Sequence, residues 1–229
     1  MSSIEQQYGP RPTLTIPDSL MPQPGLLLPA LSEEILQELS DAGWSRVGIM
    51  VAFLDPEGRI FMLEHRGRDK NAMGALGPMG ETSQRSGPII EQPIETLVRG
   101  VTEEIGHPRP AELGFYSHTD SSWIVNTWPT GTDYPGQYSC AISFPVFLSD
   151  ETARLFAEMQ PGNTEISGAR GFLYPDEILD LDDEYLRPGV KAWVEQLASA
   201  DLLHTDPNQS LQPIDFSHVY HTSLEDIAL

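Results

Sequence analysis

The strongest constraint on the fold of this 229-residue chain is an amphipathic segment from Pro93 to Ile105. Its apolar residues recur at helical spacing, at Ile94, Leu97, Val98, Val101 and Ile105. Proline is tolerated in the first turn of a helix, and Gly106 and Pro108 would end it. At 100° per residue the opposite side holds Thr96, Gly100, Glu103 and Glu104. The spacing therefore predicts a helix with two adjacent carboxylates on an outward stripe.

Glu103 and Glu104 admit two interpretations. Adjacent carboxylates at the end of a helix beside a glycine-rich loop are hard oxygen ligands, which suit Mg²⁺ or Mn²⁺ better than zinc. In an arbitrary protein, however, such a pair is usually a solvated pair on a surface helix. The pair alone leaves both interpretations open.

The segments around this helix predict strands and one long loop. Residues 47–54 are apolar and 60–64 alternate, and the turn Asp55-Pro56-Glu57-Gly58 between them indicates a hairpin. Residues 66–90 are rich in Gly, Arg, Ser and Pro and predict a long loop, a kind of segment that often carries function. Further strands are expected near 113–118, 122–127, 139–148 and 169–174, and further helices at 150–159 and 190–203.

The two ends of the chain differ from its middle. Six prolines within the first 30 residues exclude a long helix or a central strand there, so we expect an extended arm. Ser32 would cap a short helix that runs to about Asp41. From Thr205 the chain is polar with scattered aromatic residues. We therefore predict an arm with a short helix at 1–44, a domain at 45–203 and a tail at 204–229.

Charge and cysteine content exclude several classes of protein. The 13 basic and 34 acidic residues give a formal net charge of −21, which disfavours a nucleic acid polymer or a membrane surface as partner. A small phosphorylated ligand remains compatible, since a divalent metal can sit between carboxylates and phosphate. The lone Cys140 excludes an internal disulfide, and no apolar run approaches the roughly 20 residues that cross a bilayer. We expect a soluble, cytoplasmic protein.

A wider pattern resembles the signature of the Nudix hydrolase family. Glu91 is followed, after seven residues, by Arg99-Gly100-Val101-Thr102-Glu103-Glu104-Ile105-Gly106, and Pro78-Met79-Gly80-Glu81 precedes it. The family signature has Gly, five residues, Glu, seven residues and then Arg-Glu-U-x-Glu-Glu-x-Gly-U, where U is bulky and apolar. The resemblance covers about residues 45–200. It implies an α/β/α sandwich of α+β type, with a mixed sheet and a loop–helix–loop motif.

The sequence departs from this signature in three places. Ten residues rather than five separate Gly80 from Glu91, which implies an inserted loop around residues 84–87. His107 stands at the final apolar position. Gly100 replaces the first helix glutamate, which the resemblance implies is a metal ligand. Its loss predicts a rate lower by roughly 10²- to 10⁴-fold unless another group substitutes.

The resemblance implies a metal site and a catalytic base. Glu103 and Glu104, with a backbone carbonyl near Met79 or Gly80, are expected to hold Mg²⁺ or Mn²⁺. The base can come from a later loop in this family, which makes Glu165 or Glu158 the candidate. His107 is a second candidate if helical geometry continues past Gly106, and a surface histidine if it does not.

Other residues would hold the motif together or meet the substrate. The resemblance implies that Arg99 pairs with Glu91, the alternative being an exposed pair with Glu95 or Glu103, and Gly106 ends the motif. Arg66 and Arg68 lie in the most basic stretch of an acidic chain, and we expect them to contact substrate phosphate. We also expect Glu81 to contact the substrate. Ordinary solvated loop charges are the alternative for the two arginines.

These residues predict a metal-dependent Nudix-type hydrolase that cleaves the diphosphate linkage of a nucleoside-diphosphate-type compound. One alternative is a protein of the same fold that has lost turnover and binds a phosphorylated ligand, which Gly100 favours. A further alternative is an enzyme repurposed in specialised metabolism. The N-terminal arm is long enough to reach a second subunit, so a homodimer is expected.

Overall fold

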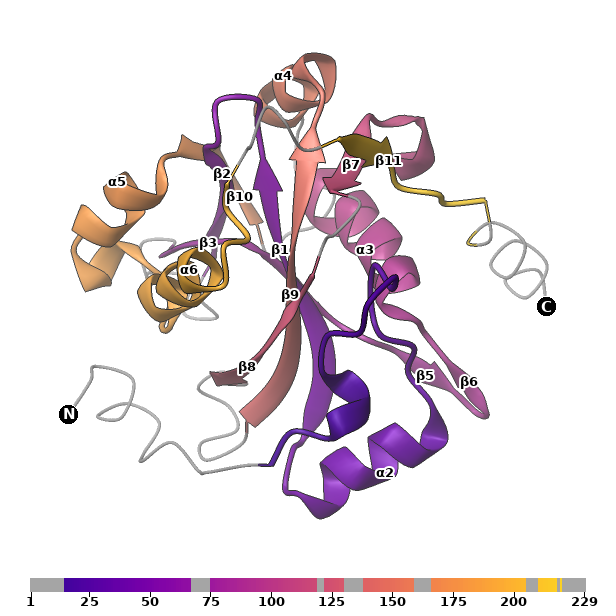
Figure 1. Cartoon of the computed structure of the whole chain (residues 1–229). Coiled ribbons are helices and arrows are strands. Elements are labelled where there is room, and N and C mark those ends of the chain that lie inside the picture. Colours follow the sequence, from indigo (N-terminus) through magenta and orange to yellow (C-terminus); the bar gives the residue numbers. More distant parts are fainter. Residues whose placement is uncertain are drawn as a thin grey trace.

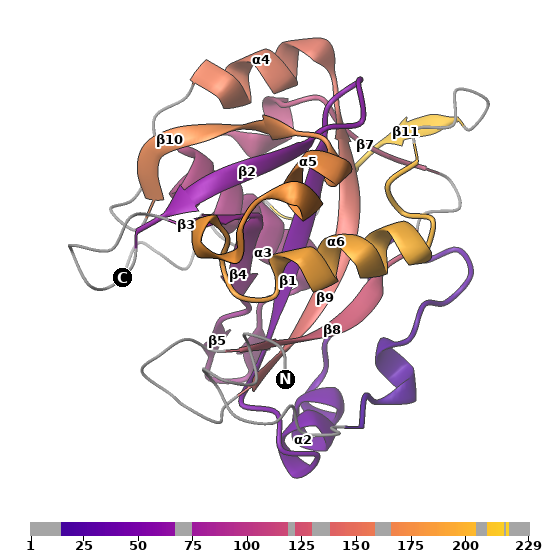
Figure 2. The same cartoon turned by 90° about the vertical axis from the view of Figure 1, so that its left-hand side faces the viewer.

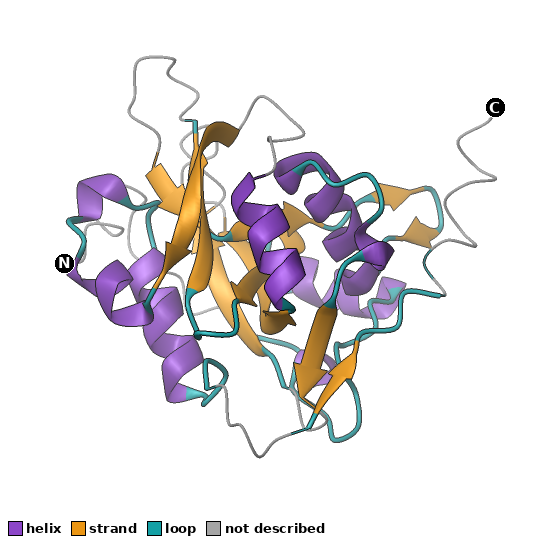
Figure 3. Ribbon diagram, turned by 90° about the horizontal axis from the view of Figure 1, so that it is seen from above, coloured by secondary structure: helices purple, strands orange, loops and turns teal. Residues whose placement is uncertain are grey.

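The structure is a computed structural model and describes residues 15–66, 75–118, 122–129, 138–158, 166–204, 210–217 and 219. Within these residues nine strands form one mixed sheet that lies between helices on both of its faces (Figure 1). Seen from above, the helices flank the sheet on opposite sides (Figure 3). The fold is therefore the α/β/α sandwich that the sequence predicts.

The parallel strands β1 (Arg46–Leu54) and β9 (Tyr138–Leu148) form the centre of the sheet. The order across the sheet is β10-β2-β1-β9-β7-β11, while β3 pairs with β2, β4 with β1 and β8 with β9, all antiparallel. The remaining bounds are β2 (Ile60–His65), β3 (Ala75–Gly77), β4 (Met79–Thr82), β7 (Phe115–His118), β8 (Ile124–Pro129), β10 (Ile166–Leu173) and β11 (Leu211–Pro213).

The helices begin where capping residues and prolines allow. The Ser32 hydroxyl accepts a hydrogen bond from the Ile35 N–H at the start of α2 (Glu33–Asp41). Gln92 and Glu95 form a capping box at the start of α3 (Pro93–Gly100), which continues as one π-helical turn, η2 (Val101–Ile105). The others are α4 (Asp150–Glu158), α5 (Pro175–Asp180), α6 (Val190–Ser199) and the short 3₁₀ turns η1 (Asp18–Leu20), η3 (Pro110–Glu112) and η4 (Asp183–Tyr185).

Two hydrophobic cores lie on the two faces of the sheet. On β1, Val51 and Phe53 face the core that α2, α3 and α4 cover, whereas Ala52 and Leu54 face the core under α5 and α6 (Figure 2). Eight of the nine residues of β1 are buried, because helices cover both of its faces. Cys140 is also fully buried, and burial raises the pKa of its thiol to about 12.

The segment 66–90 is not one long loop, as the sequence predicted. Its described part contains β3, β4 and a small hairpin of β5 (Arg85–Ser86) and β6 (Ile89–Ile90). These strands are only two to four residues long, so they carry no alternating pattern of their own. β3 and β4 form because β2 and β1 offer backbone partners from outside the segment, whereas β5 and β6 pair with each other.

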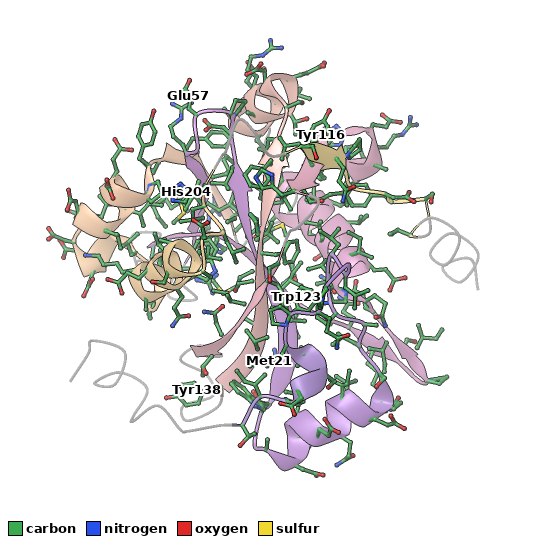
Figure 4. The ribbon with its side chains drawn as sticks, in the orientation of Figure 1. Met21, Glu57, Tyr116, Trp123, Tyr138 and His204 are labelled. Carbon is green, nitrogen blue, oxygen red and sulfur yellow. The ribbon has the colours of Figure 1, made fainter. Side chains whose placement is uncertain are left out.

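The described parts of the predicted arm and tail pack into the same core as the central domain. Leu20 is fully buried, and its carbonyl accepts a hydrogen bond from the Trp123 indole Nε1 at 2.7 Å (Figure 4). In the tail, β11 pairs with β7, and Ile214 and Phe216 are buried. Described residues from both flanks of the predicted 45–203 domain thus contribute to the core, and the division at residues 44 and 203 stays a prediction. None of the helices among the described residues has the length and apolar character needed to cross a bilayer.

Candidate active site

The candidate site forms where β4 meets α3. β4 pairs with β1, so that Glu81 lies opposite Ile49, and the hairpin β5–β6 then leads the chain to Pro93. Helix α3 packs on β4 and β1 (Figure 1). Glu81 and Arg99 are 18 residues apart in the chain, yet this path brings their side chains into contact.

Arg99 is the centre of the site. Its Nε and Nη2 donate to the two carboxylate oxygens of Glu91 at 2.9 and 3.1 Å. Its Nη1 donates to Glu81 Oε2 at 3.0 Å and to Glu103 Oε2 at 3.2 Å, and Nη2 also donates to the Thr82 carbonyl at 2.7 Å. The ion pair with Glu91 predicted from the sequence is thus present, together with the alternative pair with Glu103.

The electrostatics of Arg99 follow from these contacts. Burial by itself would lower the pKa of Arg99, but the hydrogen bonds to Glu91 and Glu81 outweigh it and raise the pKa above its ordinary value. Arg99 therefore stays charged. It holds three carboxylates in place: Glu81 from β4, Glu91 from the segment before α3, and Glu103 from η2. Hydrogen bonds of this charge-assisted kind hold geometry more tightly than neutral ones.

Glu103 and Glu104 lie in different environments, which corrects the prediction of a single outward stripe. The Glu103 side chain is 44% exposed, whereas Glu104 is only 5% exposed. The helix closes with a π turn, in which the Gly106 N–H donates to the Val101 carbonyl at 3.0 Å, so a wheel at 100° per residue fails there. Glu104 instead joins the buried side of the helix.

Thr96 and Gly100 are buried as well, against the prediction that they face outward. The Thr96 hydroxyl lies 3.1 Å from the Ser83 hydroxyl at the end of β4. A Cβ added to Gly100 would lie 2.9 Å from Glu81 Cγ and 3.0 Å from both Met79 Sδ and Met79 Cε. Small residues on this side let the helix approach β4 closely, and the space of a side chain at position 100 is already filled.

His107 lies past the end of the helix. Gly106 adopts a left-handed conformation with φ of 86°, and the His107 Nδ1 accepts a hydrogen bond from the Arg109 N–H at 3.2 Å. Helical geometry does not continue to His107, so the condition under which His107 was a candidate base is not met.

The other predicted site residues are scattered or undescribed. Met79 and Gly80 belong to β4, where their partners in β1 are Val51 and Met50. Arg66 is exposed after the end of β2, and Glu158 is exposed at the end of α4. Arg68 and Glu165 lie outside the described residues.

The sequence did not predict the ion pair of Glu81 with Arg99. It also did not predict a second group of contacts, around His65. The His65 Nε2 lies 3.2 Å from the Pro78 carbonyl, and the Arg187 Nη1 lies 3.4 Å from His65 Nδ1. The one sequence feature that could have indicated the contact of Glu81 with Arg99 is that Gly80-Glu81 directly precedes the inserted loop. The second joins residues 122 positions apart, and no local pattern marks it.

No family model matches this sequence, and no curated protein matches it. Solved structures do. The Nudix domain of Shewanella oneidensis NrtR in complex with ADP-ribose is 10% identical, and the match covers 68% of this chain and 87% of that one with a TM-score of 0.46. A Nudix hydrolase from Nitrosomonas europaea is 16% identical over 69% of this chain and 90% of that one, with a TM-score of 0.46.

An Ap4A hydrolase from C. elegans is 8% identical to this chain. The match covers 68% of this chain and 96% of that one, with a TM-score of 0.46. Each of these is a protein that this chain is similar to.

Proposed function

We propose that this chain is a metal-dependent hydrolase that cleaves the diphosphate linkage of a small nucleoside-diphosphate-type compound. The observation that carries the proposal is the gathering of carboxylates around Arg99, which binds Glu81, Glu91 and Glu103, with Glu104 next in the chain. Four carboxylates and one guanidinium leave a formal charge of −3. A diphosphate would be repelled by this charge unless a divalent cation came between them.

The donor set fits Mg²⁺ or Mn²⁺. Within the described part of the chain, no three side chains of His, Cys, Asp or Glu form a group that could hold a metal ion. Mg²⁺ does not require such a cage, because it keeps several waters and binds through one or two carboxylates plus substrate phosphate. We assign Glu103 and Glu104 as these ligands, with a backbone carbonyl near Met79 or Gly80. The bound ion would polarise phosphoryl oxygens and favour a nucleophilic water.

The remaining residues position groups or move a proton. Arg99 holds Glu103 and Glu81 in place through one nitrogen, Nη1, so that their carboxylates stay near the helix end. The attacking water must lose a proton to a base, and we propose Glu165 for this step. Arg66 and Arg68 remain the proposed contacts for substrate phosphate.

A second candidate function is ligand binding without turnover. Position 100 supplies no carboxylate, and Met79 and Glu81 fill the space into which one would project. If no other group replaces the missing carboxylate, the site would still bind a phosphorylated ligand but would not hydrolyse it at a useful rate.

A panel of nucleoside-diphosphate-linked compounds, incubated with Mg²⁺ or Mn²⁺ and assayed for cleavage products, separates the two functions. Cleavage by the native chain that falls at least about 100-fold in Glu104→Gln supports the hydrolase. The matched control is Glu112→Gln, because Glu112 is 62% exposed in an outer ion pair with Arg109. Binding of a compound without cleavage by the native chain would favour the second candidate.

A further inference from the structure

The segment before α2 is held in place by side chains from later in the chain, which bind its backbone. We call this segment, residues 15–31, the strap. Trp44 Nε1 donates to the Thr15 carbonyl at 3.0 Å, and Trp123 Nε1 donates to the Leu20 carbonyl at 2.7 Å. The two tryptophans are 5% and 1% exposed, so each buried indole N–H depends on a strap carbonyl as its acceptor. The first half of the strap is therefore fixed to the core.

The other end of the strap binds Gln92, the residue that precedes α3. The Leu31 N–H donates to Gln92 Oε1 at 2.8 Å, and Gln92 Nε2 donates to the Leu31 carbonyl at 3.1 Å. The side-chain amide thus pairs with both backbone groups of one residue, as a neighbouring strand would. Gln92 Nε2 also donates to the Ile90 carbonyl, at the end of β6, at 3.1 Å. Gln92 therefore ties the strap, the hairpin β5–β6 and the start of α3 together.

Glu91, directly before Gln92, makes the corresponding connection to Arg99. Its Oε1 accepts from Arg99 Nε at 2.9 Å, and its Oε2 accepts from Arg99 Nη2 at 3.1 Å. Two consecutive residues thus bind the guanidinium of the candidate site and the strap. We propose that Gln92 is a positioning residue, which couples the strap to the Arg99–Glu91 pair. The inference rests on the proposed function for the chemistry that this pair serves.

Gln92 passes on the constraint because it is bonded covalently to Glu91. The planar peptide unit leaves only two soft dihedrals per residue, so an anchored Gln92 limits the directions in which Glu91 can point. Coupling of this kind is reciprocal: if the strap stabilises the Arg99–Glu91 pair, the pair stabilises the strap by the same free energy. The Glu33–Arg85 ion pair, at 2.7 Å, also links α2 to the hairpin, but both side chains are more than half exposed and solvent screens them. The coupling therefore runs mainly through Gln92.

Hydrogen exchange of the full chain, followed by NMR, measures both ends of this coupling, at the Leu31 N–H and at the Arg99 Nε–H. Gln92→Ser separates the coupling from helix capping, because serine is a good N-cap but is too short to bind Leu31. We expect exchange at both sites to rise about 10-fold, the factor that one lost hydrogen bond supplies. Glu91→Gln removes the charge that pairs with Arg99, and by reciprocity it should raise exchange at the Leu31 N–H.

Gln37→Ser is the matched control, since this glutamine is exposed on α2, and both exchange rates should stay at their native values. Native exchange at the Arg99 Nε–H in Gln92→Ser would overturn the inference, as would native exchange at the Leu31 N–H in Glu91→Gln. An equal rise at the amides of β1 would overturn it too, because the whole fold would then open more often.

The exchange measurement needs no turnover, so its outcome is separate from that of the proposed hydrolysis. If the native chain cleaves none of the compounds while the exchange rates follow the expected order, the proposed hydrolysis fails and the coupling stands. If the native chain cleaves one of them, kcat should fall in Gln92→Ser and not in Gln37→Ser. An unchanged kcat in Gln92→Ser would overturn the positioning role.

Discussion

The guanidinium of Arg99 binds the carboxylate of Glu91 through two parallel hydrogen bonds, from Nε to Oε1 at 2.9 Å and from Nη2 to Oε2 at 3.1 Å. This two-point contact fixes direction as well as distance, which a lysine ammonium cannot reproduce. Because the Arg99 side chain is 17% exposed, solvent screens the pair only weakly.

Replacement of Arg99 by lysine should therefore destabilise the protein although the charge is kept. We expect Arg99→Lys to lower the free energy of unfolding by about 2 kcal/mol, the range of hydrogen bonds to charged groups. Urea unfolding measures the change. Arg109→Lys is the control, because the Arg109 side chain is 72% exposed in its pair with Glu112, and it should cost less than about 1 kcal/mol. Equal losses in the two variants would contradict a special role for the Arg99 cluster.

The sequence predicted the elements whose pattern is local. The spacing of Leu97 and Val101 predicted the position of α3 and η2, and the apolar run at 47–54 matches β1 at Arg46–Leu54. The short strands β3 and β4 were missed because their stability comes from pairing with β2 and β1, which a local pattern does not contain.

Within the site, the Arg99–Glu91 pair was predictable from the resemblance, but the burial of Glu104 was not. A helical wheel assumes 3.6 residues per turn, and the π turn of η2, which begins three residues before Glu104, breaks that assumption. The position of Glu81 was also out of reach, since it depends on how closely α3 approaches β4 at Gly100.

The close approach of β1 and β4 leads to a second prediction. A Cβ on Gly48 would lie 2.3 Å from the Glu81 carbonyl oxygen, whereas a Cβ on Gly171, in β10, meets nothing within 4 Å. Backbone cannot move aside as a side-chain end can, so Gly48→Ala should cost about 1–3 kcal/mol of unfolding free energy. Gly171→Ala should be neutral or slightly stabilising. Chemical denaturation compares the two, and a harmless Gly48→Ala would argue against this packing.

His65 gives the stability a dependence on pH. Burial, with Arg187 nearby, lowers the pKa of His65 to about 3. The Pro78 carbonyl can only accept, so the neutral ring donates from Nε2 and its Nδ1 accepts from Arg187. Below a pH of about 6.5 the unfolded chain binds a proton at His65 that the folded chain does not. The contribution of His65 is therefore complete above that pH and is lost progressively as pH falls toward 3.

The unfolding free energy of the native chain should fall across this window with a slope of up to about 1.4 kcal/mol per pH unit from His65 alone. His65→Gln should remove that part of the slope, as measured by urea unfolding between pH 7 and pH 4 (roughly the window set by the shift). His204→Gln is the control, since the His204 side chain is 81% exposed beside α6 (Figure 4). An unchanged slope in His65→Gln would show that His65 titrates alike in both states.

Two serines should respond to removal of the hydroxyl with opposite signs. Ser143, in β9, is fully buried, and its Oγ has no hydrogen-bond partner among the described residues. Ser149 precedes α4, where its Oγ accepts from the Thr152 N–H at 3.1 Å and lies 3.0 Å from the Thr152 hydroxyl. An unsatisfied buried hydroxyl opposes folding, while a capping hydroxyl favours it. Ser143→Ala should therefore raise the unfolding free energy by about 1 kcal/mol, and Ser149→Ala should lower it by about 1 kcal/mol. Denaturation midpoints that move the same way for both would mean that Ser143 Oγ is satisfied in solution, for instance by a buried water between the sheet and α6.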